Sequence, residues 1–143
     1  NATVSVDADL DPRNPHINGD AQQLRQVIHN LLQNAQDATQ QAAEQSAEPA
    51  KPVRISTVLS DTSNRVRLTV SDSGPGFPAH ILQRAFEPYV TTKPRGTGLG
   101  LAVVKKIADE HGARVDLVNR VENDVVKGAQ VSLSFPSDIA SAL

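Results

Sequence analysis

The feature that most constrains this chain is a long stripe of apolar residues at helical spacing. Asp20 stands where a helix N-cap is expected, and the stripe behind it predicts one amphipathic helix from Ala21 to about Gln45. A helix with a single apolar face must bury that face against another layer, so the chain has to form a packed domain. The stripe consists of Leu24, Val27, Ile28, Leu31, Leu32, Ala35 and Ala38.

The rest of the chain predicts strands and a second long helix. Val4 and Val6 alternate with polar residues, which indicates a short strand. The other expected elements are a strand hairpin over 53–59 and 66–70, a short helix from His80 to Ala85, a long helix around Leu99–His111 closed by Gly112, and strands over 115–118 and 129–135 joined by a turn near Asn123 and Asp124. Because the strands come in hairpins, we expect a mixed, largely antiparallel sheet covered on one face by helices, a two-layer α/β sandwich.

Length and composition narrow the function classes. With 143 residues the chain fits one domain, expected over residues 1–136, followed by a disordered tail over 137–143. The net charge of −2 gives no case for nucleic-acid binding, and no apolar run is long enough to span a bilayer. Without cysteine there is no disulfide or thiolate metal site. The absence of methionine suggests a domain taken from a longer protein.

The first helix carries a polar edge beside its apolar stripe. At 100° per residue, Asn30, Asn34 and Asp37 fall within roughly 60° of one another. A carboxamide oxygen is a hard ligand that suits Mg²⁺, which also binds substrate phosphates. Taken alone, the three residues also fit the solvated edge of an ordinary helix.

The segment Asp72-Ser73-Gly74-Pro75-Gly76-Phe77 directly follows a predicted strand. A carboxylate at a strand end can accept a hydrogen bond from an exocyclic amine, and the glycines let a ligand approach the backbone closely. Asp and Gly are also ordinary turn residues, so a simple turn explains the segment equally well.

Three alternating glycines open the second long helix, in Gly96-Thr97-Gly98-Leu99-Gly100-Leu101. N–H groups at a helix N-terminus bind anions, and Lys93 lies a few residues upstream, where it can reach a phosphate. The run lacks the Gly-Lys-Ser/Thr of a Walker A motif, and no strand precedes it as in a Rossmann fingerprint. Flexible linker glycines are the alternative.

Together these segments resemble the nucleotide-binding GHKL superfamily, over about residues 20–135. In the family's order, residues 30–35 resemble the N box, 72–76 the G1 box, 86–89 the F box, and 91–93 lead into 96–101, which resemble the G2 box. Within the superfamily, the chain looks most like the catalytic ATP-binding domain of bacterial sensor histidine kinases of the nitrogen-regulation NtrY or NtrB type. The resemblance implies the Bergerat-type fold and binding of ATP with Mg²⁺.

The resemblance also implies roles for single residues. Asn34 matches the Mg²⁺ ligand, Asp72 matches the residue that binds the adenine amino group, and Gly74 and Gly76 match the glycines that shape the adenine pocket. A mobile lid is expected from Phe86 to Arg95. Candidate catalytic residues are Asn30, Asn34 and Lys93, and the further nucleotide-binding candidates are Asp37, Phe86, Thr92, Lys93, Gly96, Thr97, Gly98, Leu99 and Gly100.

Three positions depart from family patterns. Asn30 stands where gyrase-like and Hsp90-like relatives carry a glutamate that activates water, and an amide is no general base, which argues against an efficient ATPase. Asp37 stands where some histidine kinases have a lysine that contacts phosphate. Ala129 follows Gly128 where relatives often have threonine or serine, so a water-mediated adenine contact is not expected.

The phosphoacceptor histidine of such a kinase is expected outside this chain. His16, His29, His80 and His111 all lack the acceptor context of an acidic residue followed by a proline, and each is interpreted as structural or superficial. The implied partners are a dimerisation hairpin and a response regulator, with the domain itself monomeric, cytoplasmic and without membrane contact. The alternatives are another GHKL ATPase or anti-sigma serine kinase, and a nucleotide-binding interaction module without transfer activity.

Overall fold

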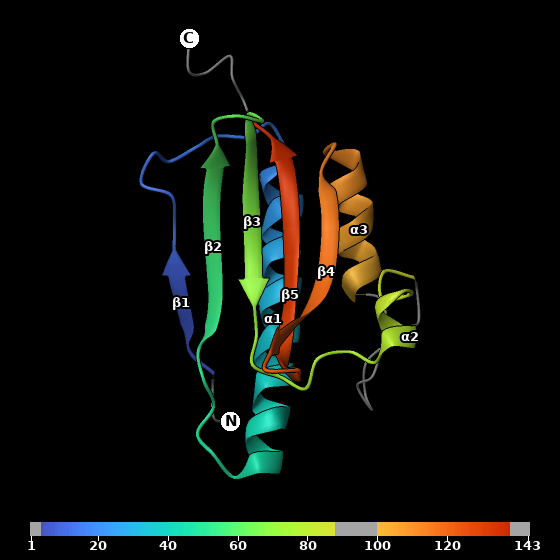
Figure 1. Ribbon diagram of the computed structural model, residues 1–143. Helices are drawn as coiled ribbons and strands as arrows, with labels where there is room; N and C mark the ends of the chain where they lie inside the picture. Colours follow the sequence, from blue (N-terminus) through green and yellow to red (C-terminus); the bar gives the residue numbers. More distant parts are fainter. Residues whose placement is uncertain (1–3, 88–99, 138–143) are drawn as a thin grey trace.

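Five strands form one sheet in the order β1-β2-β3-β5-β4 (Figure 1). The computed structural model describes residues 4–87 and 100–137. β1 (Val6–Asp9) runs parallel to β2 (Val53–Ser60), whereas β3 (Arg65–Ser71), β5 (Val125–Pro136) and β4 (Arg114–Glu122) continue the sheet in antiparallel fashion. The predicted mixed, largely antiparallel sheet is therefore confirmed.

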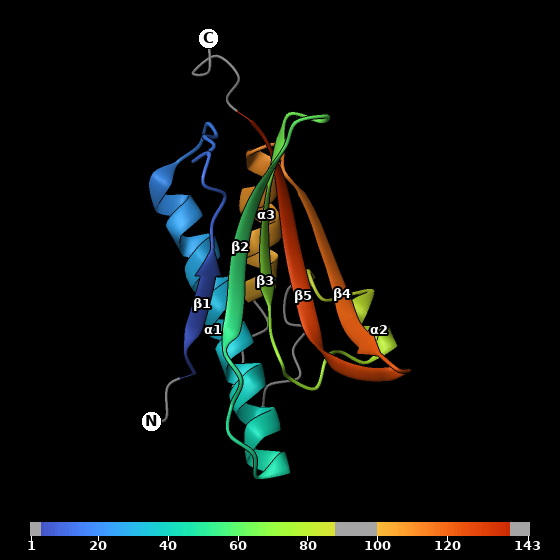
Figure 2. The same cartoon turned by 60° about the vertical axis from the view of Figure 1, so that its left-hand side comes forward.

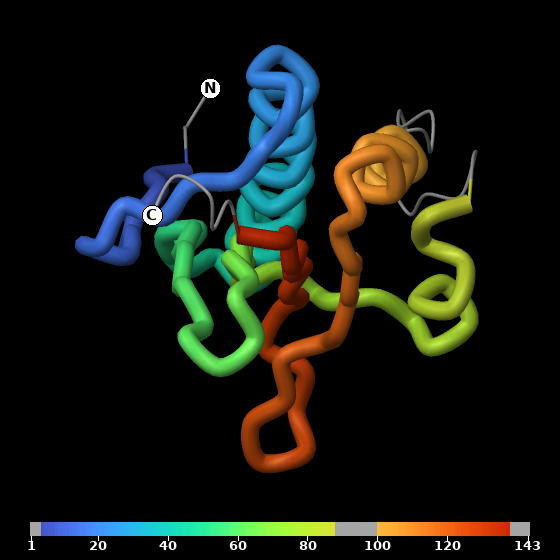
Figure 3. Tube along the Cα trace, turned by 90° about the horizontal axis from the view of Figure 1, so that it is seen from above, coloured from blue at the N-terminus to red at the C-terminus, as the bar shows by residue number. Residues whose placement is uncertain are grey.

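Two long helices cover one face of this sheet. α1 (Ala21–Ser46) and α3 (Gly100–Glu110) contact each other and lie on the same side of the strands (Figures 2 and 3). The short helix α2 (Ala79–Leu82) stands apart, beyond β4 (Figure 1). The expected two-layer arrangement is thus correct.

None of the helices in the described residues is long and apolar enough to cross a membrane.

The predicted cap and stripe explain where α1 begins and what it buries. The Asp20 carboxylate accepts hydrogen bonds from the N–H groups of Gln22 and Gln23, which satisfies two of the unpaired donors of the first turn. One stripe of α1 then packs with residues of α3 and the sheet into a single core. The most deeply buried members are Val27, Leu31, Val53, Val104, Ala108 and Leu133.

His111 joins the end of α3 to the start of α1. Its Nε2 accepts the backbone N–H of Asp20 at 3.0 Å, and its Nδ1 lies 2.8 Å from the carbonyl oxygen of Ile107. These partners require a lone pair on Nε2 and a proton on Nδ1, so the ring is the neutral Nδ1–H tautomer. Gly19 makes room for the ring, because a Cβ there would lie 2.6 Å from the His111 side chain. The structural interpretation of His111 agrees with this arrangement.

The β4–β5 hairpin is longer than the sequence indicated. β4 continues to Glu122 and β5 begins at Val125, around a turn in which Asn123 and Asp124 both have positive φ. Such values define a tight two-residue hairpin turn, which matches the right-handed twist of the strands. Polar residues near Arg120 and Lys127 interrupt the apolar alternation, but backbone pairing continues through them.

Candidate functional site

Asp72 stands directly after β3, where the sheet meets the loop of residues 72–77. Its N–H donates to the carbonyl oxygen of Ala129, and its Oδ1 accepts the N–H groups of Gly74 and Ala129, all at 2.9 Å. Within the described residues, Oδ2 receives no hydrogen bond, and no buried side-chain oxygen lacks a partner. Oδ2 must therefore reach solvent, where it can accept a hydrogen bond from a ligand.

The charge of Asp72 is shaped by three opposing influences. Burial raises the pKa of its carboxyl above the usual range, because water no longer stabilises the carboxylate fully. The N–H donors of Gly74 and Ala129 and the positive charge of Arg120 act in the opposite direction. A buried carboxyl group with a perturbed pKa and one accessible oxygen is typical of a ligand-binding site.

Close packing fixes Asp72 between α1 and β5. The N–H of Ser73 donates to Oγ1 of Thr39, a fully buried residue of α1, at 3.1 Å. A Cβ on Gly74 would lie 2.6 Å from the Cβ of Ala38, and a Cβ on Gly128 would lie 2.0 Å from the carbonyl oxygen of Asp72. Only glycine fits at these two positions of close backbone contact. The contact of Gly74 with Ala38 brings the loop directly against α1, the helix that carries Asn34.

Residues of β4 hold the same loop from its other side. The side chain of Asn119 accepts the N–H of Phe77 at 2.9 Å and donates to its carbonyl oxygen at 2.8 Å. Arg120 donates to the carbonyl oxygen of Asp72 through Nε at 3.2 Å and Nη2 at 2.8 Å. At Gly76, where φ is +75°, a Cβ would lie 2.8 Å from Oδ1 of Asn119 and would also meet Val126 of β5.

The second part of the candidate site lies where α1 meets α3. A Cβ on Gly100, the first residue of α3, would lie 3.4 Å from Nδ2 of Asn34 and 3.9 Å from its Oδ1. The positive end of the α3 dipole therefore adjoins a carboxamide. This donor set fits a cation-bound phosphate, since helix N–H groups suit phosphate oxygens and a carboxamide oxygen suits Mg²⁺.

The other α1 candidates share this edge of the helix. Asn30 and Asn34 are half-buried, whereas Asp37 is exposed and accepts a hydrogen bond from Gln33 at 3.0 Å. Phe86, the predicted start of the lid, is half-buried after α2. The remaining predicted nucleotide-binding residues lie outside the described residues, and so does most of the predicted lid: Thr92, Lys93, Gly96, Thr97, Gly98 and Leu99.

Sequence reasoning missed four residues that shape the site: Thr39, Asn119, Arg120 and Gly128. Thr39 had a usable signal, because it continues the apolar stripe four residues after Ala35. Asn119 and Arg120 lay just past the predicted end of their strand, so nothing in the pattern connected them with Asp72. Gly128 was noted only as the neighbour of Ala129.

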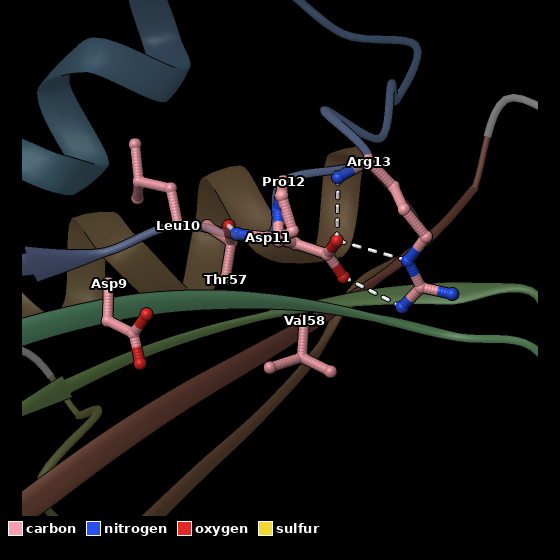
Figure 4. Close-up of a pocket in the computed structure, with 7 residues that line it drawn as sticks. All are labelled: Asp9, Leu10, Asp11, Pro12, Arg13, Thr57 and Val58. Atoms are coloured by element: carbon pink, nitrogen blue, oxygen red, sulfur yellow. Dashed lines mark hydrogen bonds and ion pairs between the residues drawn. The ribbon is translucent and has the colours of Figure 1, made fainter.

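A separate open groove of about 390 Å³ lies at the β1 edge of the sheet (Figure 4). Its central feature is Asp11, which is bound by Arg13. The groove shares no residue with the candidate site around Asp72 and Asn34, and it is lined by Asp9, Leu10, Asp11, Pro12, Arg13, Thr57 and Val58.

Residues 19–139 match the model of the family described as "Histidine kinase-, DNA gyrase B-, and HSP90-like ATPase". The chain belongs to this ATPase family. Among solved structures, this ATPase domain resembles full-length ShkA in complex with AMPPNP, with a TM-score of 0.75, 28% identity, and coverage of 94% of this chain and 26% of that one. It also resembles the nucleotide-free catalytic domain of the histidine kinase ThkA, with a TM-score of 0.70, 30% identity, and coverage of 93% and 78%.

Curated relatives of the ATPase domain are named as sensor kinases. A putative NtrY-like sensor histidine kinase of Rickettsia typhi is 38% identical over 81% of this chain, and sporulation kinase A of Bacillus subtilis is 35% identical over 85%. NtrB of Rhodobacter capsulatus, named a sensory histidine kinase/phosphatase, is 38% identical over 81%. The chain spans 17%, 18% and 34% of the lengths of these three relatives.

Proposed function

We propose that this domain binds ATP with Mg²⁺ and presents the γ-phosphoryl group to a histidine on a helical hairpin outside this chain. The observation that carries the proposal is the arrangement of Asp72. One carboxylate oxygen is occupied by two backbone N–H groups, while the other remains available as an acceptor. Family membership makes ATP the natural ligand for that acceptor.

At the base end, Oδ2 of Asp72 accepts a hydrogen bond from the exocyclic amine of adenine. Gly74 and Gly76 lie in the loop that follows Asp72, where the absence of side chains lets a planar base approach the backbone. A base with a carbonyl oxygen in place of the amine would face the carboxylate with a second acceptor. The domain should therefore prefer adenine to hypoxanthine nucleotides.

At the phosphate end, the N-terminus of α3 binds phosphate oxygens and Asn34 binds the cation. Mg²⁺ held there would neutralise negative charge on the phosphates, and it would keep water and phosphate oxygens as its other ligands. On the strength of the sequence motif, we assign further residues to the same phosphate site: Thr92, Lys93, Gly96, Thr97, Gly98, Leu99 and Gly100.

Asn30 favours transfer over hydrolysis. The position lies one helical turn before Asn34, and a carboxamide cannot take a proton from water at neutral pH. In the proposed reaction an imidazole nitrogen of the acceptor histidine attacks the γ-phosphorus, the bond from that phosphorus to the bridging oxygen breaks, and ADP leaves. The domain contributes position and charge neutralisation.

The wider context is also a proposal. We infer a two-component kinase of the NtrY or NtrB type, acting in the cytoplasm and passing its phosphoryl group to a response-regulator aspartate. The names of several relatives support this, although sporulation kinase A is nearly as similar. We expect the chain itself to be monomeric, because we assign dimerisation to the hairpin outside it.

The test is a calorimetric titration of the purified chain with ADP, with and without Mg²⁺. We expect binding that strengthens in the presence of Mg²⁺. Asn34→Ala should remove the Mg²⁺-dependent gain, while Gln26→Ala, an exposed substitution on the same helix, should keep it. No binding by the folded chain would contradict the proposal, and an unchanged Mg²⁺ effect in Asn34→Ala would refute the ligand assignment.

Phosphoryl transfer has its own test, in which the chain is incubated with γ-labelled ATP and the separately supplied hairpin of the same kinase. Labelling should be slow, because the tether between the two parts is missing. The label should survive base and be lost in acid, as expected of phosphohistidine. An acid-stable label on serine would favour the serine-kinase alternative instead.

A further inference from the structure

The loop of residues 72–77 is held at both ends by two consecutive residues of β4. Arg120 donates twice to the carbonyl oxygen of Asp72 at the start of the loop, and Asn119 makes a two-point contact with the backbone of Phe77 at its end. Neither residue lies in the motifs that identify the family. Both are half-buried, and their hydrogen bonds to the loop span more than forty positions of sequence.

This double contact coincides with an irregularity in the sheet. Consecutive side chains of a regular strand project to opposite faces of the sheet, so they do not normally hydrogen-bond to the same loop. Here the β4–β5 register shifts between Arg120 and Val121, and Arg120 pairs with Gly128. The extra residue, Lys127, lies in β5 directly before the partner of Arg120, and a bulge increases the local twist of the strands there.

The two contacts act on different parts of the loop. Ser73 and Gly74 are already fixed by α1 through Thr39 and Ala38. Beyond them, within the part of the chain that the structure describes, Asn119 is the only side chain that hydrogen-bonds to the backbone of residues 75–77. The glycine-containing half of the loop therefore depends on Asn119.

Arg120 acts on Asp72 itself. Its guanidinium group binds the carbonyl oxygen rather than the carboxylate, and it also lies 3.5 Å from Oγ of Ser73 and 3.4 Å from the carbonyl oxygen of Lys127. It thereby ties the Asp72 backbone to β5 without occupying Oδ2. An arginine on the carboxylate would have consumed the acceptor that a ligand needs.

We propose that Asn119 and Arg120 are positioning residues for base selection, which hold the loop of residues 72–77 so that Oδ2 of Asp72 stays aimed at the amino group of a purine. This inference rests on the proposed function. A pre-formed acceptor discriminates between bases because no binding energy is spent on ordering it. If the loop is loosened, the carboxylate can turn away from a base that carries a carbonyl oxygen. The repulsion between the two acceptors is then relieved, and the wrong base binds more readily.

The test compares the affinities for ADP and inosine diphosphate, which differ in carrying an amino group or a carbonyl oxygen at the selected position. We expect Asn119→Ala and Arg120→Ala each to reduce the ratio of the two affinities by about three- to tenfold, the effect of roughly one hydrogen bond. A purely structural role would lower the melting temperature and the active fraction but leave this ratio unchanged.

Conservative variants separate geometry from charge. Arg120→Lys keeps the positive charge but loses the planar fork, so it should lose part of the discrimination. Asn119→Asp keeps an acceptor for the Phe77 N–H but cannot donate to the Phe77 carbonyl oxygen. This variant should therefore also lose part of the discrimination between ADP and inosine diphosphate. Arg114→Ala, an exposed change on the same strand, is the matched control and should keep the wild-type ratio.

The outcomes separate this inference from the proposed function. If the wild-type chain does not prefer ADP, the assignment of Asp72 is wrong and the inference fails with it. If the wild-type chain prefers ADP but both alanine variants keep its ratio within twofold, only the positioning roles are wrong. Should an alanine variant not fold, the same criterion applies to Arg120→Lys and Asn119→Ser.

Discussion

Asp11 and Asp72 are both shielded carboxylates that accept backbone N–H groups, yet their remaining oxygens differ. Asp11 accepts hydrogen bonds from the N–H, Nε and Nη2 of Arg13 (Figure 4). It also accepts one from the N–H of Leu59, so both of its oxygens are occupied. Asp72 uses only Oδ1, and the nearby Arg120 binds its carbonyl oxygen instead. The pKa of Asp11 is lowered well below the usual range, chiefly by its hydrogen bond with Arg13, whereas burial raises that of Asp72.

The difference shows how one residue type serves two purposes. Asp11 and Arg13 continue the edge of β2 beyond the end of β1, since they bind the N–H and carbonyl oxygen of Leu59 in place of a neighbouring strand. Such capping protects an exposed edge from pairing with other chains. Asp72 instead keeps an acceptor available at a cost in solvation, which is the arrangement that a ligand site needs.

The largest expected effect comes from exchanging each carboxylate for an amide. In Asp72→Asn, the carbonyl oxygen should stay with the two backbone N–H donors, so the amide nitrogen would face the adenine amino group donor to donor. We expect ADP affinity to fall about 100-fold while the chain stays folded. Asp11→Asn should leave ADP affinity unchanged in the same calorimetric titration. A comparable loss in both variants would show that the two aspartates are not functionally distinct.

The next effect concerns the tight packing that holds Asp72. A methyl group on Gly128 would overlap the Asp72 carbonyl oxygen, so Gly128→Ala should lower the free energy of unfolding by about 2 kcal/mol in a urea titration. Gly112→Ala is the matched control, because φ is also positive there but a Cβ would lie 3.7 Å from its nearest contact, Cγ of Pro136. If Gly128→Ala lowers the free energy of unfolding no more than Gly112→Ala does, β5 does not pack tightly against the backbone of Asp72.

Nucleotide binding should also depend on pH through Asp72. Because Oδ1 holds two N–H donors, a proton binds Oδ2 and turns the acceptor into a donor. ADP affinity should therefore fall as the pH drops through the raised pKa of Asp72, toward the loss expected for Asp72→Asn. Calorimetric titrations at several pH values above 4 measure this. In Arg120→Ala the decrease in ADP affinity should begin at higher pH, because a positive charge that opposes protonation of Asp72 is gone. An unchanged pH dependence would argue against this electrostatic role of Arg120.

The smallest expected effect is on stability, to which Asp11 and Asp72 should contribute with opposite pH dependence. The lowered pKa of Asp11 stabilises the folded chain above the usual value of about 3.9, and this stabilisation is lost as the pH falls toward the folded-state pKa. The raised pKa of Asp72 makes its contribution decrease as the pH rises from that usual value to the folded-state pKa. The melting temperatures of Asp11→Asn and Asp72→Asn, measured against pH, should therefore depart from the wild-type pH dependence in opposite directions. Departures of the same sign would contradict the opposite pKa shifts of the two aspartates.

Local patterns were sufficient for the order of the elements, and they singled out Asp72 and Asn34 as candidate site residues. The stripe of α1, the cap at Asp20 and the hairpin turn at Asn123 and Asp124 act over a few residues, so their sequence signals are direct. The order of the nucleotide-binding motifs led to the family. Asp72 and Asn34 were singled out because residue type and position within an element determine which chemistry each can offer.

The tertiary structure decided which residues share a surface and how their polar atoms are used. That Oδ1 of Asp72 is occupied while Oδ2 remains available depends on Gly74, Ala129 and the approach of Gly128, which meet only when β3 pairs with β5. The contacts of Asn119 and Arg120 with the loop required the register of β4 on β5, which sets these residues opposite Ala129 and Gly128. Such hydrogen bonds join residues more than forty positions apart, and no local pattern encodes them because they form only when the sheet closes around the loop.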